Sequence, residues 1–179
     1  MYKYILGLIL ANLKVRKGKC LMRLKQINWP YLVLAIVIME IIGGLSSLLA
    51  GNIAGIYAQL SKPPLAPPGI VFGIVWPLLY LLLGVYSYYA FYELDHDHGS
   101  HLRLLFITQI ILNFLWCFIF FHFSAHWLGF IVILIMLVVL LELLFETKKV
   151  KNSLTYLIWP YLIWLLFATY LTVGVAILN

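Results

Sequence analysis

Aromatic and amide side chains recur at helical spacing in two apolar stretches of the chain. Trp76 and Tyr80 are four residues apart in one stretch, whereas Gln109, Asn113 and Trp116 follow one another by four and then three residues in the next. Residues three or four apart share one face of a helix. Indole and phenol rings stack on flat apolar molecules, and amides orient a bound molecule through hydrogen bonds. The pattern indicates a small-molecule site; aromatic rings at a membrane surface and hydrogen bonds between helices are the alternatives.

A third apolar stretch places Trp164 one helical turn before Ala168. A small residue beside an indole leaves a slot for a flat ligand, or it admits a neighbouring helix.

One acidic residue, Glu40, lies among leucine, isoleucine, valine and methionine in the first apolar stretch. Gly44, Ser47 and Gly51 follow it at helical spacing, so all four share a narrow face. We interpret this face as a close helix contact with Glu40 hydrogen-bonded across it, and a proton relay or a ligand contact is the alternative.

Metal sites and conventional catalytic motifs are not expected. Asp95, His96, Asp97, His98 and His101 are close in sequence, but their spacing matches no known metal site and a solvated loop explains them better. The chain has no recognisable nucleotide-binding loop, zincin motif or Ser-His-Asp arrangement. We therefore predict no metal site and no required cofactor.

The composition is that of a membrane protein, with 65% hydrophobic and only 10% charged residues. About 20 consecutive apolar residues cross a bilayer as a helix. Five segments are long enough, with short connections between them: 29–50, 69–92, 102–123, 127–145 and 154–178. We predict an all-α membrane protein, a five-transmembrane-helix bundle over residues 29–179, preceded by a basic N-terminal extension over residues 1–28.

The net charge of +6 is unevenly distributed along the chain. With five spans and the N-terminus inside, eleven of the twelve lysines and arginines fall on the inner side, and Lys62 falls on the outer side. Because positive loops are retained in the cytoplasm, this predicts a cytoplasmic N-terminus, with the first interhelical loop and the C-terminus outside. A basic strip beside a membrane also attracts anionic lipid, so we expect membrane lipid and not nucleic acid as a partner.

The loop between the first two spans carries Pro63, Pro64, Pro67 and Pro68. Proline fixes φ and cannot donate a backbone hydrogen bond, so this loop is stiff and extended. We predict that it forms a rigid lid over the helix ends. Lys62, which begins it, is the one outer cation available to pair with a ligand carboxylate.

Four motifs in this order resemble one known family. They are Y-A-Q-L-S-K-P from Tyr57, V-W-P-L-L-Y-L-L-L-G-V-Y-S-Y from Val75, Q-I-I-L-N-F-L-W-C-F-I-F-F from Gln109 and P-Y-L-I-W-L-L-F-A-T from Pro160. Together they resemble the TspO/MBR family, which includes the tryptophan-rich sensory proteins of bacteria and the translocator protein, or peripheral benzodiazepine receptor, of mitochondria. The resemblance covers about residues 42–179.

The resemblance implies a five-helix bundle, commonly a homodimer, with a pocket under the loop between helices one and two. Members bind porphyrins such as protoporphyrin IX, haem, sterols in animals, and benzodiazepine-type ligands. It therefore implies binding of porphyrin-type tetrapyrroles and other flat lipophilic molecules, with a sensory or regulatory role in tetrapyrrole or oxidative-stress handling. At matching positions the pocket would be lined by Tyr57, Pro67, Pro68, Trp76, Tyr80, Gln109, Asn113, Trp116, Trp164, Phe167 and Ala168, with Lys62 at its mouth.

An enzyme is the main alternative, because some bacterial members degrade protoporphyrin in light and oxygen. Trp76 and Trp164 would then be the redox-active residues, since the matching positions hold no carboxylate or histidine for acid–base chemistry. Two family tryptophans are replaced by Ile56 and Leu65, and the sequence leaves open whether catalysis survives this change. A lipophile transporter is less favoured, because no inverted repeat is evident. The missing animal sterol motif and transit peptide favour a bacterial plasma membrane.

Overall fold

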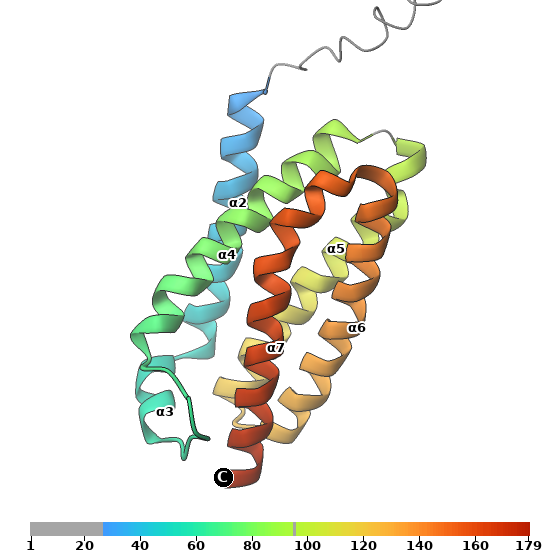
Figure 1. Cartoon of the computed structure of the whole chain (residues 1–179). Helices are drawn as coiled ribbons and strands as arrows, with labels where there is room; N and C mark the ends of the chain where they lie inside the picture. Colours follow the sequence, from blue (N-terminus) through green and yellow to red (C-terminus); the bar gives the residue numbers. More distant parts are fainter. Residues whose placement is uncertain (1–26, 95) are drawn as a thin grey trace, which may run out of the picture.

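The computed structural model describes residues 27–94 and 96–179, and within these ranges all regular structure is helical. Most of the predicted extension, apart from Ile27 and Asn28, lies outside the described residues. Five long α-helices form the body of the molecule (Figure 1). They are α2 (Trp29–Ala50), α4 (Ile70–Tyr88), α5 (His96–Cys117), α6 (His126–Lys151) and α7 (Thr155–Leu178). The predicted all-α, five-helix architecture is confirmed.

Four segments are long and apolar enough to cross a membrane. Three of them are Trp29–Ala50, Ile70–Glu93 and Gly99–His122, and the fourth, His126–Leu178, contains both α6 and α7. A single 3₁₀ turn, Asn152–Leu154, joins those two helices. The segment predicted at 29–50 is the observed range of α2, whereas α5 begins six residues before its predicted segment and α6 ends six residues after its own. Polar residues continue the helical backbone at both of these places.

The ends of α4 and α5 and the connection after α2 have their own local structure. A π-helical turn follows α4 at Tyr89–Glu93, and another follows α5 at Phe118–His122. After α2, a short helix, α3 (Ile53–Gln59), begins where the Asn52 side chain accepts a hydrogen bond from the backbone N–H of Gly55 at 3.0 Å. This side-chain cap satisfies one of the free donors at the start of the helix.

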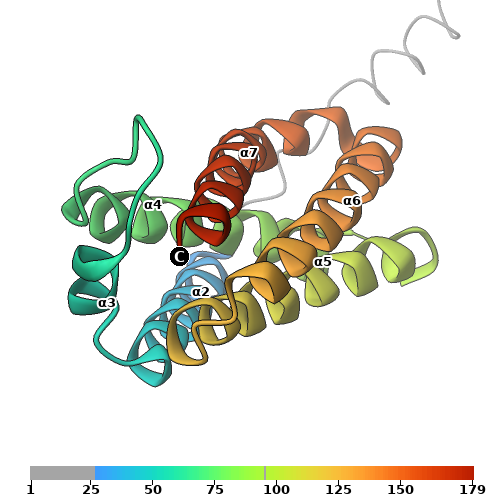
Figure 2. The ribbon, with the colours of Figure 1, turned by 90° about the horizontal axis from the view of Figure 1, so that it is seen from below.

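The long helices pack in a closed ring in the order α2, α4, α7, α6, α5 and back to α2 (Figure 2). The helix α3 and the C-terminus lie at the same end of the bundle (Figure 1). The proline loop is fastened to α7 there: the Tyr170 hydroxyl donates to the Pro64 carbonyl at 2.6 Å, and the Asn179 amide bonds both backbone groups of Ser61 at 3.0 and 2.9 Å. The loop is therefore held in place by the last helix.

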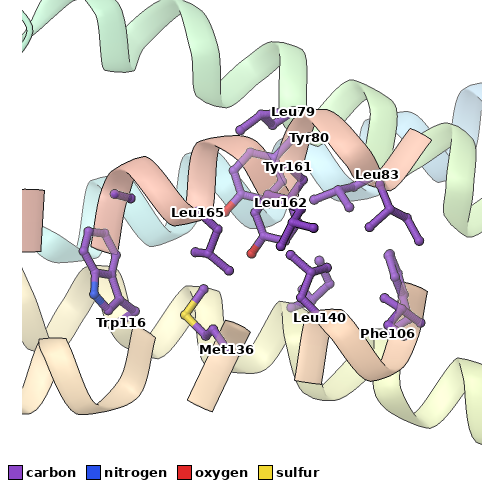
Figure 3. Close-up of a cluster of buried hydrophobic side chains, with 14 of the residues drawn as sticks. Leu79, Tyr80, Leu83, Phe106, Trp116, Met136, Leu140, Tyr161, Leu162 and Leu165 are labelled. Atoms are coloured by element: carbon purple, nitrogen blue, oxygen red, sulfur yellow. The ribbon is translucent and has the colours of Figure 1, made fainter. Parts of the chain in front are cut away.

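The buried core runs along the inside of the ring. Figure 3 shows part of it, with the rings of Tyr80 and Tyr161 lying among leucines of α4, α6 and α7. Two helices meet closely at Gly84, where an added Cβ atom would lie 2.6 Å from the Cα atom of Ile36. Glycine is needed at this position because α2 and α4 meet backbone to backbone.

Candidate functional site

A cavity of about 580 Å³ lies at the end of the bundle that carries α3. It is bounded by the second half of α2, the start of α3, the first half of α4, the end of α5 with its π turn, and α7. Small-molecule sites typically occupy roughly 300–1,000 Å³. The cavity is large enough for an organic ligand, and its lining includes the aromatic residues Tyr57, Phe72, Trp76, Tyr80, Trp116, Phe121 and Trp164.

The aromatic rings of the wall contact one another. The ring centroids of Tyr57 and Phe72 are 5.0 Å apart, those of Phe72 and Trp164 are 5.7 Å apart, and those of Trp76 and Tyr80 are 5.8 Å apart. The first two pairs meet edge to face, which is a favoured arrangement for aromatic rings. The rings are thus held against each other in a wall that spans α3, α4 and α7.

A buried hydrogen-bond network supports this wall. The Tyr80 hydroxyl donates to Oδ1 of Asn113 at 2.7 Å, and Nδ2 of Asn113 donates to the Tyr161 hydroxyl at 2.9 Å. Nε2 of Gln109 also donates to the Tyr161 hydroxyl, at 3.0 Å. Both ends of the Asn113 amide are therefore bonded to tyrosines, and Gln109 lies fully buried behind the wall.

Glycines on α2 and α4 leave the cavity empty. A Cβ atom added to Gly44, Gly51 or Gly73 would meet no other atom within 4 Å, and all three residues line the cavity. Gly43 has a different role, because an added Cβ atom would collide with the ring of Tyr80. The small-residue face of α2 therefore borders open space over most of its length instead of packing on a neighbouring helix.

Glu40 lies on this face and lines the cavity. It is half-buried, and its carboxyl has no hydrogen bond or ion pair with any residue in 27–94 or 96–179. The sequence predicted that Glu40 forms a hydrogen bond to a closely packed neighbouring helix. The structure shows no such bond. The cavity thus includes a carboxylate that the matching family positions did not reveal; an acidic residue in an apolar stretch was the available signal.

Most of the residues predicted for the site line this cavity. They are Tyr57, Trp76, Tyr80, Asn113, Trp116, Trp164 and Ala168. Phe72 and Phe121 also line it but were not predicted, and only their place in the aromatic-rich segments hinted at them.

The loop residues predicted for the site lie elsewhere. The Lys62 ammonium donates to the carbonyl groups of Tyr57, Ala58 and Leu60 at 2.9, 3.2 and 2.8 Å, which uses all three of its protons at the end of α3. The Pro67 carbonyl accepts from the Tyr57 hydroxyl at 2.8 Å.

Burial raises the pKa of the Tyr57 phenol, so it stays protonated as a donor. Pro68 is exposed, and Phe167 packs on Trp164 with ring centroids 5.7 Å apart, outside the cavity lining. The roof consists of Asn52, which caps α3, and the α3 residues Ile53, Ala54 and Tyr57.

Two indole N–H groups of the wall have no partner in the described part of the chain. Nε1 of Trp116 and Nε1 of Trp164 are both buried without a hydrogen bond. Buried donors are normally paired, so each of these needs an acceptor. Both atoms are closed off from the cavity as the side chains lie, so a ligand can provide the acceptor only when an indole ring turns.

The histidine cluster contributes little to this region. The side chains of residues 95–98 lie outside those described, and His101 is exposed, with Nε2 3.2 Å from a Glu142 carboxylate oxygen. Among the residues that the structure describes, no three histidine, cysteine or acidic side chains are grouped to hold a metal ion.

Residues 32–178 match the TspO/MBR family over almost all of the described chain. The chain belongs to the TspO/MBR family. It is 35% identical over 153 residues to the tryptophan-rich protein TspO of Archaeoglobus fulgidus, covering 79% of this chain and 98% of that protein. It is 34% identical over 117 residues to the human translocator protein, covering 63% and 68%. The translocator protein homolog of Schizosaccharomyces pombe is 33% identical over 129 residues, covering 69% and 77%.

Membership of the TspO/MBR family confirms the resemblance found in the motifs, and it makes this chain a multi-pass membrane protein. The family match includes every residue of the cavity lining. The cavity of this chain combines an aromatic wall with an acidic residue on α2.

Proposed function

We propose that this protein binds porphyrin-type tetrapyrroles, such as protoporphyrin IX or haem, and other flat lipophilic molecules in the cavity beneath α3. We propose that binding serves a sensory or regulatory role in tetrapyrrole or oxidative-stress handling. The observation that carries the proposal is a cavity of about 580 Å³ walled by seven aromatic residues from five elements. A rigid planar ligand loses little conformational entropy on binding, and each aromatic pair adds about 0.5–1.5 kcal/mol beyond the burial of its surface.

The test is a titration of the purified protein with protoporphyrin IX, followed by quenching of tryptophan fluorescence. Gly73→Leu places a side chain in the empty part of the cavity, so we expect an affinity at least tenfold lower. Ile74→Phe is the matched control, because Ile74 is exposed next to Gly73 and does not line the cavity. Equal affinities for the wild type and Gly73→Leu would contradict the proposed location.

We infer that the cavity faces the outside of a bacterial plasma membrane, with the N-terminus in the cytoplasm. The described charges support this, because Lys148, Lys149 and Lys151 lie at the end of α6, whereas Lys62 follows α3 at the opposite end. Impermeant maleimide should label Ser61→Cys and not Ser153→Cys in intact cells when the native cysteines are replaced by serine. The reverse labelling pattern would contradict the orientation.

We also infer a homodimer, supported by the family resemblance alone. Light scattering of the protein in detergent, corrected for bound detergent, measures the protein mass directly. A value of 20.6 kDa, that of one chain, would contradict it.

A second candidate function is light- and oxygen-dependent degradation of porphyrin. The observation in its favour is that Trp76 and Trp164, the two candidate redox residues, both line the cavity. The loss of porphyrin absorbance under illumination in air should then be faster with the wild type than with Trp76→Phe, and absent in the dark. Equal rates for the two proteins would exclude a role for Trp76.

A further inference from the structure

We propose that Glu40 selects the charge and orientation of the ligand in this cavity: the group that reaches α2 is a cation or an N–H donor, and anionic or carbonyl groups point to the other walls. The inference deepens the proposed function, because it concerns the same cavity, but it requires only that some planar molecule enters.

Glu40 lies deep in the membrane. It is about 15 Å from either end of α2 at a rise of about 1.5 Å per residue, so it sits near the middle of a segment that crosses the bilayer. An ionisable group at this depth is costly and normally has a partner.

That partner is not found in the described part of the protein. The cationic side chains that the structure describes, Lys62, Arg103 and the lysines at the end of α6, are placed near the helix ends. The polar groups across the cavity are already bonded to one another, since the Tyr80 hydroxyl donates to Asn113 and the Asn113 amide donates to Tyr161. The carboxyl of Glu40 is therefore left to interact with whatever occupies the cavity.

The other walls have the opposite polarity. Trp116 on α5 is 8% exposed, and its indole N–H lacks an acceptor, as does that of Trp164 on α7. The cavity thus has an acceptor on α2, while the unpaired donors of Trp116 and Trp164 lie behind its surface and come within reach of a ligand when an indole ring turns. A ligand with a positive or N–H edge and an acceptor edge satisfies both, and the ring faces of Trp76 and Tyr80 add cation–π attraction for its positive edge.

Glu40 favours a cationic ligand in either of its protonation states. A bound cation favours the carboxylate and pairs with it, whereas a bound anion either meets a like charge or requires the carboxyl to take up a proton. The cation is favoured over the anion in both cases.

Two planar probes that differ in one substituent test the inference: 9-aminoacridine, a cation, and acridine-9-carboxylate, an anion. Binding is measured in zwitterionic nanodiscs for the wild type, for Glu40→Gln, and for Glu142→Gln as a matched control outside the cavity. We expect the wild type and Glu142→Gln to bind the cation at least tenfold more tightly than the anion, and Glu40→Gln to reduce this ratio to less than threefold. A ratio unchanged by Glu40→Gln, or no preference for the cation in the wild type, would overturn the inference.

A third probe, the dimethyl ester of protoporphyrin, separates this inference from the proposed function. The ester has no charge, so its binding to the wild type reports porphyrin binding alone, and we expect Glu142→Gln to bind it within twofold of the wild type. Failure of the ester to bind, with the acridine preference intact, removes the porphyrin proposal and leaves the selection by Glu40. Binding of the ester with an acridine ratio that does not depend on Glu40 does the reverse.

Discussion

The hydrogen-bond network behind the cavity predicts a strong energetic coupling between Tyr80 and Asn113. Asn113→Leu removes two bonds, one from the Tyr80 hydroxyl at 2.7 Å and one to the Tyr161 hydroxyl at 2.9 Å. It also leaves the Tyr80 hydroxyl buried without its acceptor. Tyr161 keeps its bond from Gln109 at 3.0 Å, so only one group is left unpaired.

The magnitude follows from these contacts. Hydrogen bonds between membrane helices contribute about 0.6 kcal/mol each on average, and a buried group left without a partner costs about 1–3 kcal/mol. Asn113→Leu should therefore lower the free energy of unfolding by about 2–4 kcal/mol. Tyr80→Phe removes one bond and leaves Oδ1 of Asn113 unpaired, which gives about 1.5–3.5 kcal/mol.

The double variant lacks both the Tyr80 hydroxyl and Oδ1 of Asn113, so it leaves neither group unpaired. We expect it to be no less stable than Asn113→Leu alone, so the coupling equals at least the cost of Tyr80→Phe, about 1.5 kcal/mol. The measurement is reversible unfolding in mixed micelles, followed by circular dichroism and tryptophan fluorescence.

A second buried tyrosine provides the control. The Tyr86 hydroxyl is 2.7 Å from Oγ1 of Thr147 and shares no partner with Asn113. Tyr86→Phe should therefore add to Asn113→Leu within about 0.5 kcal/mol. If the effects of the Tyr80 and Asn113 changes on the free energy of unfolding were also additive, the two residues would not be energetically coupled, and the prediction would be wrong.

Three further predictions concern the wall, the roof and the helix contact. Tyr80→Phe keeps the ring in the cavity and should hold the affinity for protoporphyrin IX within about threefold, whereas Tyr80→Leu removes a stacking partner and should weaken binding by about two- to tenfold; equal titrations of the two variants would contradict stacking. Lys62→Met removes three bonds to carbonyl groups, so the backbone amides of residues 53–59 should exchange with deuterium about tenfold faster. The affinities for protoporphyrin and for its dimethyl ester should fall equally. A loss of affinity confined to the free acid would instead show that Lys62 pairs with a ligand carboxylate. Gly84→Ala forces apart the contact with Ile36 and should lower the free energy of unfolding by about 1–3 kcal/mol, measured in the same micelles; unchanged stability would mean that α2 and α4 separate at little cost.

Hydropathy alone located the five long helices, because a membrane-spanning helix needs an apolar run of fixed length. It placed the first segment at 29–50, the observed range of α2. It missed the start of α5 and the end of α6, where polar residues continue the helix into water and carry no hydropathy signal. It also missed α3, since seven residues between two prolonged apolar segments are too few for a periodic pattern.

The site was predictable where helical spacing determines which way a side chain points. Trp76, Tyr80, Asn113 and Trp116 were grouped by spacing, and they line one cavity. Pro67 was not predictable in this way, because the path of a loop depends on tertiary contacts such as the bond from Tyr57. Spacing shows which residues share a face, but not whether that face meets a helix or a hollow.

Glycine in this bundle has two opposite roles that composition cannot distinguish. Gly84 and Gly43 lie where a neighbour touches the helix, one against the backbone of Ile36 and the other against the ring of Tyr80. Gly44 and Gly73 lie on the same two helices, yet a Cβ atom added to either would enter empty space. Gly43 and Gly44 are adjacent in sequence and therefore differ by one step of about 100° around α2. The room for a ligand is thus determined by the angular position of the glycines on α2 and α4, while the close contacts at Gly43 and Gly84 keep those helices together around it.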